Sequence, residues 1–178
     1  MRQKFLEWDS RTTTRIRVAE RPGRLRSLAA VLAHSGDSWF WLMGLAVLWW
    51  RGAAYWKSRA LTLIVAILLT ALVVVVIKLT FRRRRPAGEW GQFYRNTDPH
   101  SFPSGHATRA CMLAVLVIGL GPAWFAAILL IWAPLVSLAR AAMGVHYISD
   151  VLAGMAIGIL LGVLYQLIHL PGLLGIGL

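Results

Sequence analysis

Cysteine is almost absent from this chain, which has a single one, Cys111, among 178 residues. One cysteine excludes an intrachain disulfide, and its place in an apolar stretch favours packing over chemistry. The sequence shows no zinc-finger spacing and no aromatic RNA-binding motif. The first long apolar run begins late, after a basic stretch, and no small-residue cleavage site follows it, so we expect no cleaved signal peptide.

Acidic residues are also scarce: seven Asp and Glu stand against 19 Lys and Arg, for a formal net charge of +12. On a soluble chain such an excess would suggest nucleic acid as a partner. Here the positive charge gathers in the first 27 residues and in the arginines at 82–85, beside apolar segments. We therefore expect membrane lipids with anionic headgroups as partners, and no nucleic acid.

Apolar residues make up 58% of the chain and the mean hydropathy is +0.63, which is high for a soluble domain. In lipid, a helix satisfies its own backbone hydrogen bonds, so apolar runs of near-spanning length are best explained as helices. The sequence therefore predicts an all-α, polytopic membrane bundle of about five transmembrane helices. The expected helices cover 38–50, 60–81, 107–120, 123–143 and 150–169.

Two regions differ in composition. Residues 1–36 are basic, and we expect a partly helical, amphipathic N-terminal segment on the membrane surface. We expect residues 37–178 to form the transmembrane domain, and we expect the helical structure to be interrupted at residues 36–37. The first expected helix, 38–50, is short for a span: it rises about 20 Å, against about 30 Å of hydrocarbon.

A glycine stripe marks the last expected helix, in which Gly154, Gly158 and Gly162 recur at every fourth residue. Such a stripe lets another helix approach closely. We expect it to serve packing inside one bundle rather than a dimer interface.

Two helices separate the polar loop at 82–106 from the loop at 141–149, so both loops must lie on the same side of the membrane. Ionisable residues at membrane depth are costly and call for a function. In this chain they cluster at or near these two loops. The clustered residues are Lys78, Arg85, His106, Arg140, His146 and Asp150.

Several of these residues suit a phosphate group. Lys78, Arg85 and Arg140 supply fixed positive charge, and the planar guanidinium can hold two phosphate oxygens at once. Ser104 and Gly105 stand where a helix begins, so free backbone N–H groups there can point at an anion. Gly105 also allows the backbone to come close. The neighbouring arginines at 82–84 are expected to anchor the helix end in the interface.

Two histidines and a carboxylate could carry out chemistry on that phosphate. His146 and Asp150 are four residues apart, which places them on one face of a helical turn. Asp150 can accept a hydrogen bond from one ring nitrogen and leave the other as a nucleophile. His106 can protonate the leaving alkoxide and later activate water to hydrolyse the phosphohistidine.

The same three residues, His106, His146 and Asp150, could instead bind a metal ion. Three nearby cations would repel a divalent ion, so we expect no metal and no cofactor. A further alternative is a non-catalytic membrane protein that binds lipid phosphate through its arginines. It would tolerate the loss of both histidines.

These clusters resemble the three-part signature of the type 2 phosphatidic acid phosphatase superfamily. Its first motif, Lys, six residues, then Arg-Pro, is matched by Lys78 and Arg85, and its second, Pro-Ser-Gly-His, stands at 103–106. Its third is Ser-Arg, five residues, His, three residues, Asp. Here Ala139 replaces the serine and the other positions match: Arg140, His146 and Asp150.

The resemblance implies metal-independent hydrolysis of a lipid phosphomonoester or diphosphate, with His146 as nucleophile, Asp150 as its partner and His106 as general acid. It implies that the phosphate is held by Lys78, Arg85, Ser104, Gly105 and Arg140. Candidate lipids are phosphatidylglycerophosphate, phosphatidic acid, a prenyl diphosphate and a lipid A phosphate. The soluble vanadium haloperoxidases share the signature, but the apolar chain disfavours that use. Ala139 lacks a hydroxyl that we expect to contact the phosphate or a neighbouring side chain.

The expected location is the bacterial cytoplasmic, or inner, membrane. The basic N-terminus favours a cytoplasmic start and, after two helices, a cytoplasmic active site. Bacterial lipid phosphatases that share the signature usually act on the outer face, and some of the positive charge here serves phosphate. The two arguments conflict on the membrane face, and the oligomeric state stays open.

Overall fold

The computed structural model describes residues 2–88, 90, 97–168 and 172, and this part of the chain is built of helices. Within it, the isolated antiparallel bridge between Arg84 and His100 is the one strand-like pairing. The predicted all-α architecture is confirmed. The helices are α1 (Arg2–Ile16), α2 (Arg24–Ser35), α3 (Ser38–Arg51), α4 (Ala54–Phe81), α6 (Gly105–Leu120), α7 (Ala123–Ala142) and α8 (Ile148–Leu167).

Each of the five predicted membrane helices corresponds to one helix, α3, α4, α6, α7 or α8. By length and composition α4, α7 and α8 can cross a membrane, whereas α6 is a shorter apolar helix of 16 residues. Helix α4 begins six residues before the predicted start, and α8 begins two residues early. The predicted end of α8, at His169, lies outside the described residues.

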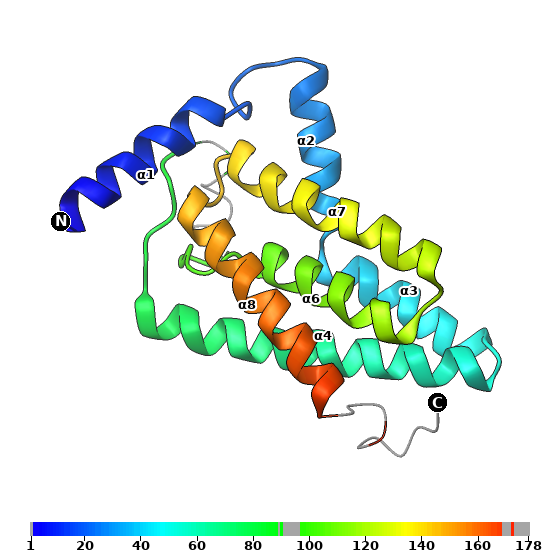
Figure 1. The fold of residues 1–178 in the computed structure, drawn as a ribbon. Coiled ribbons are helices and arrows are strands. Elements are labelled where there is room, and N and C mark those ends of the chain that lie inside the picture. The colour runs from blue at the N-terminus through cyan, green and yellow to red at the C-terminus, as the bar shows by residue number, and fades with distance from the viewer. Residues whose placement is uncertain (1, 89, 91–96, 169–171, 173–178) are drawn as a thin grey trace.

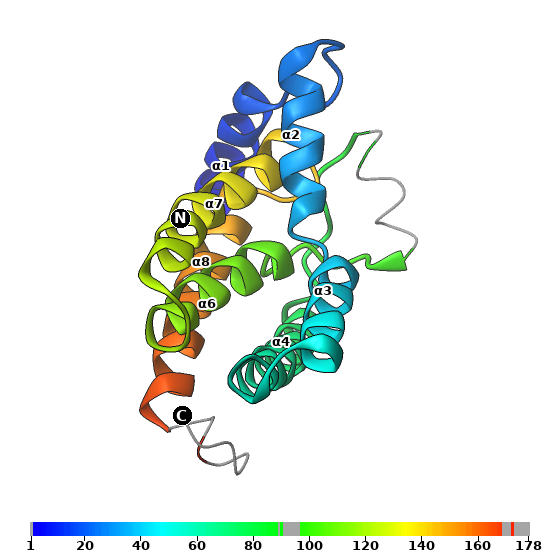
Figure 2. The ribbon, with the colours of Figure 1, turned by 90° about the vertical axis from the view of Figure 1, so that its right-hand side faces the viewer.

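The helices form two groups around the start of α6. Helices α6, α7 and α8 pack together, while α3 and α4 form an antiparallel hairpin on the other side of α6 (Figures 1 and 2). Helices α1 and α2 lie at the end where α7 stops and α8 begins. The predicted break falls between α2 and α3, at Gly36 and Asp37.

Large apolar side chains cover the outside of the long helices. Leu72, Ile131 and Leu160 are each more than 60% exposed, and similar residues surround them on α4, α7 and α8. In water this much apolar surface would drive association, but in a bilayer it contacts lipid tails. The outer surface therefore fits an integral membrane protein.

The glycine stripe of α8 packs against α6, as predicted. A Cβ atom at Gly154 would lie 2.7 Å from the Ser104 carbonyl oxygen, and one at Gly162 would lie 2.7 Å from the Val115 Cβ. At Gly158 the added carbon would overlap the Thr108 carbonyl oxygen. The absence of side chains thus allows the two helix backbones to touch, which fixes the start of α6 relative to the start of α8.

Replacing Gly158 with alanine should destabilise the fold by about 1–3 kcal/mol, because the methyl group forces α6 and α8 apart. Thermal unfolding in detergent measures the effect. Gly44→Ala is the matched control: it also lies in a helix, but nothing lies within 4 Å of its Cβ position. That change should stabilise the chain by about 0.5–1 kcal/mol. Equal midpoints for the two variants would contradict the close packing of α6 on α8.

Candidate active site

A cavity of about 220 Å³ lies where α4 ends and α6 begins. Its apolar side is formed by α4, and its polar side gathers charged groups from four parts of the chain. Six of the eight predicted site residues line it: Lys78, Arg85, Gly105, His106, Arg140 and His146. The other two, Ser104 and Asp150, are fully buried beside it.

The two predicted loops meet at this cavity, so their placement on one side is confirmed. The Arg85 guanidinium donates to the Val145 carbonyl oxygen at 2.8 Å, and its Nη1 lies 3.2 Å from His146 Nε2. The Ser104 amide donates to the Asp150 carbonyl oxygen at 3.0 Å. These contacts join the end of α4, the start of α6 and the loop between α7 and α8.

The His146 ring is oriented by a backbone group. Its Nδ1 lies 2.8 Å from the Ser101 carbonyl oxygen, which can only accept a hydrogen bond. Nδ1 therefore carries the ring hydrogen and Nε2 presents a lone pair. Burial lowers the pKa of His146 well below its usual range, and the charges of Arg85 and Arg140 lower this pKa further. The ring is thus neutral at neutral pH, the state that a nucleophile needs.

Asp150 does not make the hydrogen bond that the sequence predicted. Its Oδ2 lies 3.9 Å from His146 Nδ1, too far for a hydrogen bond, and instead accepts from the Tyr147 amide at 2.9 Å. Asp150 is the third residue of α8, and a side chain there reaches back to the amide that precedes the helix. Asp150 therefore holds the loop that carries His146, while the Ser101 carbonyl orients the ring.

Arg83 also differs from its prediction as an interfacial anchor. It donates to Asp150 at 2.7 Å, to Asp9 at 2.6 Å and to the Ser149 hydroxyl at 2.6 Å. Asp9, on α1, is fully buried and accepts in turn from the Ser149 amide at 3.1 Å. Arg83 is not a motif position and follows a long apolar helix, so the sequence predicted an anchor in the interface; in the structure two buried carboxylates neutralise its charge. Helix α1 thereby helps to hold the start of α8.

His106 has a carboxylate partner that the sequence analysis missed. Its Nε2 lies 2.6 Å from Asp37 Oδ1, and Asp37 Oδ2 lies 3.1 Å from His34 Nδ1. Burial tends to raise the pKa of Asp37, but its bonds to the two histidines outweigh that effect and lower this pKa. Asp37 therefore stays ionised and accepts the Nε2 hydrogen of His106. The ring's other nitrogen, Nδ1, is left for a substrate.

Arg109 is a second missed residue, and it lies three positions after His106 on α6. It lines the cavity and donates to the Gly36 carbonyl oxygen. Its place in an apolar helix gave no local signal of a role. Together with the contact from Asp37 to His106, it fixes the break between α2 and α3 against the start of α6.

A carboxylate occupies the position predicted for substrate phosphate. Asp98 forms an ion pair with Lys78, and its Oδ2 accepts from Arg85 Nη2 at 2.7 Å. The Asp98 backbone oxygen also accepts from Arg85 Nε at 2.6 Å. A phosphate that binds both cations must therefore displace this side chain.

Asp98→Asn should strengthen phosphate binding, because the amide removes the competing negative charge and keeps the shape. We expect the inhibition constant of inorganic phosphate to fall about tenfold, which is about 1.4 kcal/mol. Product inhibition of phosphate release measures it. An unchanged or larger constant would show that Asp98 supports the cradle instead of competing for it.

The remaining predicted positions differ in their surroundings. The Ser104 hydroxyl is buried and makes no hydrogen bond within the described part of the chain, and Gly105 opens α6 at the cavity wall. Ala139 packs against Ala29 and Ala33 of α2, away from the cavity lining. A serine there would place its hydroxyl among alanine side chains, so the expected phosphate contact is not the role of this position.

Among the residues that the structure describes, no group of three His, Cys, Asp or Glu side chains could hold a metal ion. The cavity instead brings cationic groups next to two histidines. Such a wall binds an oxyanion and stabilises negative charge that develops on it. Its chemistry fits phosphoryl transfer to a histidine.

Residues 59–171 match the PAP2 superfamily. A decaprenylphosphoryl-5-phosphoribose phosphatase from Mycobacterium tuberculosis is 33% identical over 82% of this chain and 80% of its own. An undecaprenyl-diphosphatase from Sulfolobus acidocaldarius is 29% identical over 75% of this chain and 66% of its own. A lipid A 1-phosphatase from Rhizobium etli is 30% identical over 79% and 69%.

Two crystal structures share the fold. A transmembrane PAP2-type phosphatidylglycerolphosphate phosphatase from Bacillus subtilis aligns with a TM-score of 0.74 over 93% of this chain and 86% of that one, at 24% identity. LpxE from Aquifex aeolicus aligns with a TM-score of 0.65 over 84% and 90%, at 27% identity. The helical arrangement is thus one that membrane phosphatases use.

Proposed function

The chain belongs to the PAP2 superfamily, and from this premise we propose that it releases phosphate from a lipid through a phosphohistidine at His146. It is an integral membrane hydrolase that acts on lipid phosphate esters or diphosphates. The observation that carries the residue assignment is the cavity itself. It places the acceptor nitrogen of His146 beside Arg85, with His106 and Arg140 in the same wall.

In the first step, the phosphate displaces Asp98 and binds Lys78, Arg85 and Arg140. Nε2 of His146 attacks phosphorus, and the bond from phosphorus to the lipid oxygen breaks. While the phosphate is bound, His106 is protonated at both ring nitrogens: Asp37 accepts from Nε2, and Nδ1 gives its proton to the departing oxygen, which leaves the ring neutral. As His146 becomes positive, its Nδ1–H continues to donate a hydrogen bond to the Ser101 carbonyl oxygen, which stabilises the charged ring.

In the second step, water attacks the phosphohistidine. His106 now accepts a proton from that water, the bond from phosphorus to nitrogen breaks, and inorganic phosphate leaves. The guanidinium groups stay in place and stabilise the equatorial oxygens in both transition states. No step requires a metal ion.

The non-catalytic alternative has less support. The three relatives are named as phosphatases, and a protein that merely held phosphate would gain nothing from two oriented histidines. Asp37 orients the His106 ring, and the Ser101 carbonyl orients the His146 ring. Such paired orientation is what proton transfer and nucleophilic attack require.

We place the protein in the bacterial cytoplasmic membrane, with its active site at the end that carries α1 and α2. Helix α1 contacts Arg83, which binds Asp150, through Asp9, and the turn that follows α2 contacts His106 through Asp37. The many basic residues of α1 and α2 favour the cytoplasmic face for this end. Accessibility of a cysteine introduced at Arg11, which is exposed, to an impermeant thiol reagent in intact cells would identify the face.

Phosphate release by purified protein in detergent tests the function directly. The panel contains phosphatidic acid, phosphatidylglycerophosphate, a polyprenyl monophosphate, a polyprenyl diphosphate and lipid A, each with excess chelator. Release that persists in chelator is the expected result. Release that needs added metal would overturn the mechanism, and folded protein that releases phosphate from no lipid would overturn the function.

A further inference from the structure

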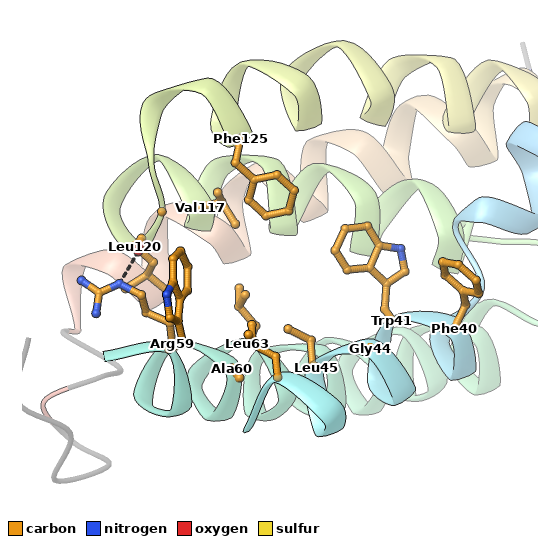
Figure 3. Close-up of a pocket in the computed structure, with 13 residues that line it drawn as sticks. Phe40, Trp41, Gly44, Leu45, Arg59, Ala60, Leu63, Val117, Leu120 and Phe125 are labelled. Carbon is orange, nitrogen blue, oxygen red and sulfur yellow. Dashed lines mark hydrogen bonds between the residues drawn. The ribbon is translucent and has the colours of Figure 1, made fainter. Parts of the chain in front are cut away.

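A second cavity, of about 260 Å³, shares no lining residue with the catalytic cavity. Figure 3 shows the side chains that line it. It lies between the α3–α4 hairpin on one side and the turn from α6 to α7 on the other, and it is partly open to the outside. Apart from Arg59 at its edge, its wall is apolar. Lining residues include Trp41, Gly44, Leu45, Ala60, Leu63 and Phe125.

Such a wall offers nothing to water, which needs two to four polar partners. Inside a bilayer the available occupant is hydrocarbon. A 150 Å³ apolar cavity in a soluble protein holds benzene, so by proportion this one holds about ten carbon atoms. That volume corresponds to about two isoprene units, or the last part of a longer chain.

The two cavities lie along one face of α4. The apolar wall of the catalytic cavity includes Ile67 and Val74, and the second cavity is lined by Ala60 and Leu63. In chain order, these four positions of α4 follow one another at intervals of three, four and seven residues, which is the spacing of a single helical stripe. Leu63 and Ile67 are one turn apart, so a chain that leaves the catalytic cavity along α4 reaches the second cavity next.

The length of this path separates two classes of lipid. From Lys78 to Leu63, α4 rises about 22 Å at about 1.5 Å per residue. The phosphate lies in the headgroup region, and half of a bilayer with its headgroups is about 20–22 Å deep. The acyl chains of a diacyl lipid whose phosphate is at Lys78 therefore end near Leu63, at the near edge of the second cavity. The cavity continues along α4 to Trp56, about 10 Å further, so a chain that fills it must pass the bilayer midplane.

We infer that the second cavity receives the distal part of a polyprenyl chain, so that the preferred substrate is a long-chain polyprenyl phosphate or diphosphate. The inference rests on the proposed phosphatase function and adds the class of lipid. Two of the relatives are named for decaprenyl and undecaprenyl lipids, whose chains have the required length. Packing against Trp41 and Phe125 supplies the selectivity, because lipid tails and cavity wall are equally apolar.

A chain-length series tests the inference. The measurement is kcat/KM for phosphate release in detergent, with polyprenyl monophosphates from two to eleven isoprene units and with dipalmitoyl phosphatidic acid. We expect the longest substrates to exceed the shortest by about tenfold, the lower range of shape selection in an apolar pocket. Phosphatidic acid should group with the short substrates.

Gly44→Phe should abolish that preference. Nothing lies within 4 Å of the Gly44 Cβ position, so the ring enters the cavity without displacing the backbone. The ratio of long-chain to short-chain kcat/KM should then fall to about one. Val47→Phe is the matched control, because Val47 lies on the same helix and is 59% exposed. It should keep the wild-type ratio.

The outcomes distinguish a failure of the inference from a failure of the proposed function. A wild-type enzyme that hydrolyses all chain lengths equally would overturn the inference and leave the phosphatase function intact. The same holds for a Gly44→Phe variant that keeps the long-chain preference. Failure to hydrolyse any substrate would instead overturn the proposed function.

Discussion

The His146→Ala variant should lose phosphate release by at least about 10⁴-fold, because it lacks the nitrogen that we assign to the covalent intermediate. The binding groups remain, so the variant should still bind the substrate. With radiolabelled lipid phosphate and a rapid quench, wild-type protein should carry an acid-labile phosphoryl label. The variant should carry none.

His100→Ala provides a matched control for this result. His100 lies in the loop before α6, and its pairing with Arg84 is made by backbone atoms. The control should keep at least half of the wild-type rate and the full label. Turnover that survives in His146→Ala with an unchanged fold would remove His146 as the nucleophile.

The second large effect is expected for His106→Ala, and it should depend on the leaving group. General acid catalysis contributes about 10²–10⁴-fold, so hydrolysis of an alkyl lipid phosphate should fall by that factor. An aryl phosphate such as p-nitrophenyl phosphate has a leaving group that needs no proton. Its first step should be nearly unaffected, whereas hydrolysis of the phosphohistidine should slow because water has lost its base.

The variant should therefore release a burst of about one equivalent of p-nitrophenol and then stall with labelled enzyme. Asp37→Asn is the companion variant, since it removes the charge that holds His106 Nε2 and leaves the ring. It should show a smaller loss with the same dependence on leaving group. Equal losses for alkyl and aryl substrates would assign His106 to binding instead of proton transfer.

Much of the architecture could be predicted because a bilayer leaves few options for an apolar segment. The five helices followed from runs such as the one that forms α4, and the number of crossings put Arg85 and His146 on one side. Helix ends were less certain, because polar residues next to the membrane continue a helix without an apolar signal. Lys57, Ser58 and Arg59, in the first turns of α4, are such a case.

The partners of the motif residues could not be predicted. Asp37 lies 69 residues before His106, and Asp9 lies 74 residues before Arg83, so no local spacing connects them. The group that orients His146 is the Ser101 backbone carbonyl, which every residue type possesses. A sequence motif contains no information on long-range contacts or on backbone atoms. These contacts nevertheless decide which nitrogen of each histidine faces the substrate.

The close packing of α6 on α8 has a consequence for how such an enzyme can diversify. The two histidines lie at the starts of these helices, and the contacts at Gly154 and Gly158 fix that separation. The α3–α4 hairpin, by contrast, provides most of the second cavity. Substitutions among the hairpin residues that line the second cavity can therefore change which lipid is accepted, while the distance between the two histidines is conserved.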